Sequence, residues 1–280
     1  MTTVTDISEF TTELNDGFYS KKILIEGDSW VSHPFPNVTN IGDQIDRFNP
    51  DDYLVLNIAE PGDEAKEIFM PHGRQMKRLK RLLNSPQWGD TFDLIFLSAA
   101  GNDIVGPEIV SHGYVKNKRD FPDLLGKELI TVNFYNAMSD VVKGYSRFLK
   151  MRNSSALNEA TPVITHVYSY LTPREVGTHI GNIDFNKGWV KKHLKHQGIR
   201  DEEEQYDILL EMLDAFYRRV IKLEKDFNNF LVVDTRKLLL KNGQPDINLW
   251  FDEIHPNIKG FKKITRHIRK TAQQRGLWNL

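Results

Sequence analysis

The chain has 280 residues, of which 40% are hydrophobic and 27% are charged, and it contains no cysteine. This composition excludes collagen-like, low-complexity and disordered proteins, and the length allows a full hydrophobic core. There are 37 lysine and arginine residues against 38 aspartate and glutamate residues, so no overall positive charge favours nucleic acid. The lack of cysteine excludes disulfides, thiolate metal sites and a cysteine nucleophile.

The stretch from Met1 to Asp16 is polar and acidic, and it lacks the basic and apolar regions of a signal peptide. The longest apolar runs have the length of strands, far below the roughly 20 residues that cross a bilayer. We therefore expect a cytoplasmic protein without integral membrane association, while export by a route without a cleaved signal stays open.

Five short runs rich in apolar and β-branched residues recur along the chain. They are Lys22–Glu26, Tyr53–Ala59, Asp93–Ser98, Pro162–Tyr168 and Phe230–Asp234. Their apolar character is nearly continuous rather than alternating, which is typical of strands covered on both faces. The pattern predicts a parallel sheet.

Segments with helical spacing lie between these strands. They are Asp63–Asn84, Leu124–Met151, Asp201–Asn228 and a last helix after Pro256. Pro71 and Gly73 predict a kink or a break in the first of them. Because strands and helices alternate, we expect right-handed βαβ crossovers and a three-layer α/β/α sandwich.

The stretch from Leu171 to Arg200 fits this alternation worst, since it is rich in glycine and carries a basic run from Lys191 to His196. We interpret residues 171–200 as an excursion over the sheet edge that could act as a lid, and the basic run as solvated surface. With no repeat and no Pro-, Gly- or Ser-rich linker, the chain is predicted to form a single domain over residues 1–280.

In an open parallel sheet, ligands bind at the carboxyl ends of the strands, so the residues there are the first candidates for a site. The blocks at these positions are Gly27–Trp30, Glu60–Asp63, Ala99–Asp103 and Trp250–Pro256. We expect their serine, glycine turn, asparagine and Asp-x-x-His pair to meet at one rim of the sheet.

These residue types suit nucleophilic catalysis. A serine hydroxyl such as that of Ser29 is a poor nucleophile until a base takes its proton, and His255 can do so near neutral pH. The imidazole needs an acceptor on its other nitrogen, a role open to Asp252 or Glu253. A tetrahedral intermediate needs donors, for which the Ser29 and Gly62 amides and the Asn102 side chain are candidates.

The conjunction of the four blocks resembles the SGNH (GDSL-type) serine hydrolase superfamily. The matching blocks are Gly27-Asp28-Ser29, Asn57–Asp63, Ala100–Asp103 and Asp252–His255. The resemblance implies a catalytic triad of Ser29, Asp252 and His255, with Asp252 favoured over Glu253 by the family spacing. It also implies an oxyanion hole from Ser29, Gly62 and Asn102, and a flavodoxin-like sheet of five parallel strands.

Two departures from the family pattern stand out. Trp30 occupies the usual position of a leucine, and the glycine of the Gly-x-Asn-Asp block is shifted by one to Gly101. The Gly-Asp-Ser-Trp motif resembles that of a bacterial branch of the superfamily. Near these blocks, Asp28 is interpreted as a loop brace, and His33 is a candidate for lining the pocket.

The predicted function is a metal-independent serine ester hydrolase that forms an acyl-enzyme on a soluble short-chain or O-acetylated ester. No cofactor and no metal is expected, and the partner is a small-molecule, carbohydrate or lipid ester. Three alternatives stay open: a lysophospholipase or lipid acyl hydrolase, a metallophosphoesterase, and a non-catalytic binding protein on the same scaffold. No oligomeric state is predicted.

Overall fold

The computed structural model describes residues 2–33, 39–47, 53–86, 92–180, 183–184 and 187–278. Its main sheet has six strands in the order β1-β3-β2-β4-β5-β8, and every neighbouring pair is parallel. The strands are β1 (Thr2–Val4), β2 (Lys21–Gly27), β3 (Tyr53–Asn57), β4 (Leu94–Ser98), β5 (Val163–Val167) and β8 (Phe230–Asp234). The predicted parallel, flavodoxin-like α/β fold is confirmed, and all five predicted strands are present.

The number of strands is corrected from five to six, because β1 adds an edge strand beside β3. Its residues Thr2–Val4 pair with Leu54–Leu56, and only Val4 is buried. A three-residue strand with two threonines gives no apolar run, which is why the sequence pattern did not reveal it.

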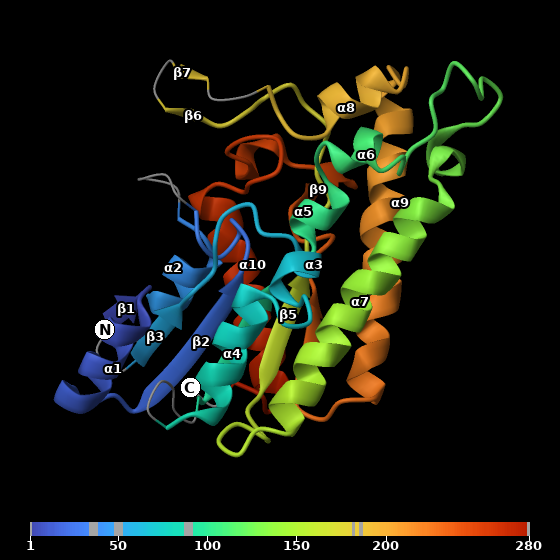
Figure 1. Ribbon diagram of the computed structural model, residues 1–280. Helices are drawn as coiled ribbons and strands as arrows, with labels where there is room; N and C mark the ends of the chain where they lie inside the picture. Colours follow the sequence, from blue (N-terminus) through green and yellow to red (C-terminus); the bar gives the residue numbers. More distant parts are fainter. Residues whose placement is uncertain are drawn as a thin grey trace.

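Helices cover both faces of the sheet (Figure 1). They are α1 (Ile7–Asp16), α2 (Ile41–Asp46), α3 (Ala65–Ile68), α4 (Arg74–Asn84), α5 (Gly101–Ile104), α6 (Glu108–Ser111), α7 (Val132–Asn153), α8 (Lys191–His196), α9 (Glu202–Val220) and α10 (Ile258–Gln274). Helix α7 packs against α4 and α9 on one face, whereas α10 packs against α2 and β8 on the other. The three predicted layers are therefore formed.

Smaller elements complete the chain: the hairpins β6 (His179–Ile180) with β7 (Ile183–Asp184) and β9 (Leu240–Lys241) with β10 (Gln244–Pro245), and 3-10 turns at Gly126–Leu129, Ile221–Lys225 and Ile247–Leu249. The predicted helix over Asp63–Asn84 is broken into α3 and α4, as Pro71 and Gly73 indicated. Among the described residues, every helix is too short or too polar to serve as a transmembrane span.

The central strands are buried on both faces, which accounts for their continuous apolar sequence. All five residues of β3 and all five of β4 are buried, and Leu24, Val55 and Phe96 are completely inaccessible to solvent. Since the interior of the sheet is filled, the loops at the carboxyl ends of the strands are left to form a site.

Glu26 is a carboxyl that is fully buried in β2. Its Oε1 accepts the Gly27 amide at 3.0 Å, and its Oε2 has no hydrogen-bond partner among the described residues. Burial raises the pKa of Glu26 from 4.5 to about 8, and the Gly27 amide opposes this rise. At pH 7 the group is therefore protonated in the folded chain and ionised in the unfolded chain.

The buried Glu26 is expected to make the fold less stable as the pH rises from 4.5 to about 8, because the unfolded chain releases this proton first. Above that range the cost is on the order of 5 kcal/mol. Glu26→Gln removes it, so the unfolding temperature of the variant should fall less between about pH 5 and pH 9 than that of the wild type. The exposed Glu159→Gln is the control, and parallel curves for all three proteins would contradict the prediction.

Candidate active site

The site lies where the strand order reverses. Strand β2 has β3 on one side and β4 on the other, so the chain crosses over it between its second and third long strands. Ligands of doubly wound sheets bind at such a switch point, beyond the carboxyl ends of the strands. Ser29 follows the end of β2 by two residues, and the Asp28 amide donates to Ser98 O at 2.9 Å, which joins this turn to the end of β4.

Ser29, His255 and Asp252 form a continuous chain of hydrogen bonds, although 226 positions separate the serine from the histidine. Ser29 Oγ lies 2.8 Å from His255 Nε2, and His255 Nδ1 lies 2.8 Å from Asp252 Oδ2. Their exposed fractions are 8%, 4% and 0%, respectively. The geometry has the nucleophile, base and orienting carboxylate arrangement of a serine triad.

The loop that carries Asp252 and His255 is shaped by Asp252 itself. Its Oδ1 accepts the Ile254 amide at 2.9 Å and the His255 amide at 2.7 Å, and Thr178 Oγ1 donates to its Oδ2 at 3.1 Å. Burial raises the pKa of Asp252, but the His255 charge and the hydrogen bonds from His255 and Ile254 outweigh burial, so the net shift is downward. An ionised Asp252 requires His255 Nδ1 to donate, which leaves Nε2 free to accept the serine proton.

Glu253, the competing candidate, does not contact His255 through its carboxylate. Its two oxygens accept four backbone amides, those of Arg174, Trp189, Val190 and Lys191. The side chain is only 1% exposed, and burial raises its pKa while the four amides act in the opposite direction. The local sequence does not reveal this role, because all four donors lie more than sixty positions earlier in the chain.

The excursion over residues 171–200 is bound to the triad loop by further contacts. Arg174 donates to Asp252 O at 2.5 Å, and the Glu253 amide donates to Val176 O at 3.0 Å. Gly188 has φ +88°, and a Cβ there would lie 2.5 Å from Glu253 Oε2, so only glycine fits. In Figure 1 this segment, with β6, β7 and α8, lies beyond the ends of the strands.

The three predicted oxyanion donors lie at the ends of β2, β3 and β4. Neither the Ser29 amide nor the Gly62 amide donates to another described residue, and Gly62 has φ +91°. One hydrogen of the Asn102 amide is used, because Nδ2 donates to Asp63 O at 2.8 Å. The second hydrogen has no acceptor in the described part of the chain, so an amide hydrogen remains for a substrate oxygen at each position.

Asp103 connects the asparagine loop to the glycine loop, a contact that the sequence pattern does not predict. Its carboxylate accepts the Ala65 amide at 2.6 Å and the Lys66 amide at 3.3 Å, at the start of α3. Ala100, where the family pattern has glycine, adopts φ +113°. Gly101 is required for a different reason, since a Cβ there would lie 2.8 Å from Asp28 Oδ2.

Asp28 and Trp30 brace the serine turn. Asp28 Oδ1 accepts the Trp30 amide at 3.0 Å and Ser98 Oγ at 3.1 Å, and the Tyr168 hydroxyl donates to Oδ2. Burial raises the pKa of Asp28 to about 6, against these hydrogen bonds. Trp30 Nε1 donates to Ile254 O at 3.2 Å, so the unusual tryptophan joins the serine turn to the triad loop.

His33 lies against the triad, with its ring centroid 4.7 Å from that of His255. Burial lowers its pKa to about 4, so it is neutral at physiological pH. Among the described residues, His33, Asp252 and His255 hold potential metal-ligand atoms within 4.8 Å of one another. A metal there would have to displace the bonds of His255 to Ser29 and Asp252, so we assign no metal to this cluster.

A pocket opens beside Ser29, and its empty space of about 350 Å³ includes open solvent. It is lined by Asp28, Ser29, Trp30, Gly101, Asn102, Ile104, Val105, Tyr168, Leu171, Leu213 and Ile254. Its exposed lining is mostly apolar, which suits a small hydrocarbon group.

No family model matches the sequence, and no curated protein matches it. Among solved structures, one described as a platelet activating factor from Streptococcus pneumonia aligns with a TM-score of 0.53 at 12% identity, covering 95% of this chain and 90% of that one. A structure described as a GDSL-like lipase from Parabacteroides merdae aligns with a TM-score of 0.51 at 13% identity, covering 93% and 98%. At such identities the likeness shows the fold alone.

Proposed function

We propose that this chain, which has an SGNH (GDSL-type) hydrolase-like fold, is a metal-independent serine ester hydrolase that works through an acyl-enzyme. The observation that carries the proposal is the chain of two 2.8 Å contacts from Ser29 through His255 to Asp252. Amide donors at the ends of three strands accompany it, which supplies the second component that acyl transfer requires.

In the acylation step, Ser29 Oγ attacks the ester carbonyl carbon while its proton passes to His255 Nε2. The negative charge that develops on the carbonyl oxygen is stabilised by the Ser29 and Gly62 amides and by Asn102. The tetrahedral intermediate then collapses, the bond to the alcohol breaks, and the alcohol oxygen takes the proton from His255. Asp252 stabilises the transient imidazolium.

In the deacylation step, water attacks the Ser29 ester and gives a proton to His255 Nε2. The second tetrahedral intermediate releases the carboxylic acid, and the His255 proton returns to Ser29 Oγ. His255 gains and then releases one proton in each step, and Ser29 is regenerated. The reaction therefore consumes the ester and one water and needs no other reactant.

The substrate class that we propose is a soluble short-chain or O-acetylated ester. The small, mostly apolar pocket beside Ser29 supports an acyl group of limited length. A lysophospholipase would instead show rates that rise with acyl-chain length. A panel of acyl lengths and acetylated sugars given to the purified chain separates these two outcomes.

Ser29→Ala is expected to abolish p-nitrophenyl acetate hydrolysis and labelling by a fluorophosphonate probe, since the attacking oxygen is removed. The loss in kcat should be about 10⁴-fold or greater. Ser32→Ala, three positions along the same turn, is the matched control and should keep both properties. Unchanged turnover in Ser29→Ala would exclude the proposal, and activity lost to a chelator and restored by a divalent metal would favour a metallophosphoesterase.

Asn102→Ala is expected to lower kcat by about 10²–10³-fold, because one donor to the oxyanion is lost. KM should change much less, since the donor is most effective once charge has developed in the transition state. The measurement is a kcat and KM determination with p-nitrophenyl acetate, accompanied by the unfolding temperature. A wild-type kcat in a folded Asn102→Ala protein would remove this residue from the oxyanion hole.

A further inference from the structure

We infer that the pocket beside Ser29 holds the acyl group of the substrate, and that Leu171 and Leu213 close its end and set the longest acyl chain accepted. The inference rests on the proposed ester hydrolase function. It adds that the pocket binds the acyl half of the ester and selects it by length. Both leucines line the pocket, and they are 3% and 2% exposed.

The sheet order places these leucines on the β5 side of the pocket, with β4 between β5 and the strand that precedes the nucleophile. The pocket runs from Ser29, at the end of β2, past Asn102, at the end of β4, to Leu171, which follows β5. Leu213 belongs to α9, the helix that connects β5 to β8 at the far side of the sheet. An acyl chain bonded to Ser29 would therefore meet the two leucines with its terminal carbons.

The alcohol half of the ester is not expected to occupy this pocket, because of the position of His255 and the apolar lining. The leaving alcohol must lie where His255 Nε2 can protonate it, and His255 does not line the pocket. A polar alcohol such as a sugar would also leave its hydroxyl groups unpaired against an apolar lining, at a cost in binding free energy. A hydrocarbon acyl chain carries no such cost.

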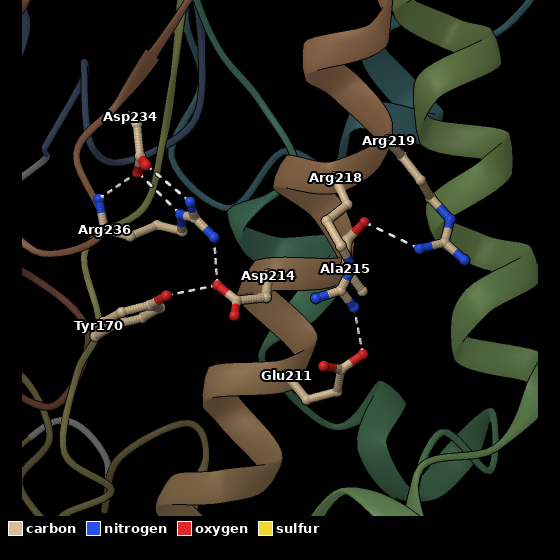
Figure 2. A network of polar contacts seen from close by, with 8 residues as sticks. All are labelled: Tyr170, Glu211, Asp214, Ala215, Arg218, Arg219, Asp234 and Arg236. Atoms are coloured by element: carbon tan, nitrogen blue, oxygen red, sulfur yellow. Dashed lines mark hydrogen bonds and ion pairs between the residues drawn. The ribbon is translucent and has the colours of Figure 1, made fainter.

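A network of polar contacts joins the residues that neighbour these leucines in the sequence (Figure 2). Asp214, next to Leu213, accepts the Tyr170 hydroxyl at 2.5 Å, and Tyr170 precedes Leu171. Arg236 bonds to Asp214 and to Asp234, and its guanidinium lies 3.8 Å from the ring centroid of Tyr217.

This network joins three elements around the two leucines: the loop after β5, the end of β8 and the middle of α9. The Tyr170 amide also donates to Arg236 O at 2.8 Å, and the Arg236 side chain is only 12% exposed. Charge-assisted bonds in a partly buried setting resist displacement better than exposed ion pairs do. The wall is therefore expected to keep its position when a longer acyl chain presses against it.

Leu213→Ala is the direct test, measured as kcat/KM for p-nitrophenyl acetate, butyrate and octanoate. The ratio of octanoate to acetate should rise about tenfold or more, which is the selectivity that one to a few methylenes provide in an apolar pocket. Leu213→Phe should act oppositely and lower the ratio of butyrate to acetate. Leu209→Ala is the matched control, because Leu209 is equally buried on the same helix but does not line the pocket.

Fluorophosphonate labelling and a set of acetate esters with different alcohols distinguish failure of the proposed function from failure of the acyl-pocket inference. If the wild type hydrolyses none of the esters and no fluorophosphonate labels it, the proposed function itself fails. If the wild type is active but Leu213→Ala has the same ratio as Leu209→Ala, only the acyl-pocket inference fails. It also fails if Leu213→Ala alters the discrimination between acetate esters of different alcohols instead of between acyl chains.

Asp214→Asn tests the part assigned to the network, because it weakens the bonds to Arg236 and Tyr170 without changing the lining. The octanoate-to-acetate ratio should rise, though less than in Leu213→Ala. An unchanged ratio in a folded variant would overturn the assignment of the rigid wall to this network.

Discussion

Replacing Asp252 by asparagine is expected to lower kcat for p-nitrophenyl acetate by about 10⁴-fold without unfolding the chain. Asp252 Oδ1 accepts the Ile254 and His255 amides, so the asparagine oxygen must stay at that position. Its NH₂ group then faces His255 Nδ1, which can only accept from it. The proton of the neutral imidazole moves to Nε2, and His255 can no longer take the proton of Ser29.

The control for Asp252→Asn is Asp246→Asn, a cap of the neighbouring 3-10 turn that accepts the Asn248 amide at 3.1 Å. This variant should keep the wild-type kcat. The kcat of both variants is measured from about pH 5 to pH 9, with unfolding temperatures, so that a wrong tautomer is distinguished from a lost fold. A kcat within tenfold of the wild type for Asp252→Asn would mean that another group orients His255.

The strands of this fold could be predicted because burial on both faces leaves a direct trace in the sequence. The run Leu94–Ser98 is apolar until its last residue, and every position in it is buried. Strand β1 left no such trace, because Thr2–Val4 takes its stability from pairing with β3 rather than from its own burial. An edge strand of this kind depends on its partner, which local composition does not reveal.

The site residues that come soon after the end of a strand could be predicted from the sequence. Ser29, Gly62 and Asn102 each come soon after a buried run, and a parallel sheet brings such ends together. The supporting residues could not be found in this way. Asp103 acts on the start of α3, 37 and 38 positions away, and Trp30 bonds to the carbonyl of Ile254, 224 positions away. Such contacts arise only when the chain has folded.

Glu253 is the supporting residue with the largest expected effect. It is buried beside Asp252 and satisfies four backbone amides of the excursion over residues 171–200. Glu253→Ala leaves these amides without an acceptor, and the expected loss of stability is on the order of 3–5 kcal/mol, because buried donors are costly when unpaired. Urea unfolding of both proteins measures this loss.

A purely structural role for Glu253 would lower stability and leave the kcat of the folded protein unchanged. We expect more than this, because Arg174 and Thr178, in the segment that Glu253 anchors, both bond to Asp252. If the segment loosens, Asp252 loses partners and holds His255 less firmly. The kcat of Glu253→Ala, measured well below its unfolding temperature, should therefore fall about 10–100-fold, the range in which misplaced supporting groups reduce rates.

The split between kcat and KM gives the decisive readout for Glu253. A His255 that Asp252 holds less firmly is a less effective base for Ser29, so kcat should fall while KM changes little in Glu253→Ala. Glu175→Ala is the matched control, since Glu175 is an exposed acid of the same segment, paired with Lys195. If Glu253→Ala has the wild-type kcat and KM despite its lower stability, the residue holds the segment without positioning the triad.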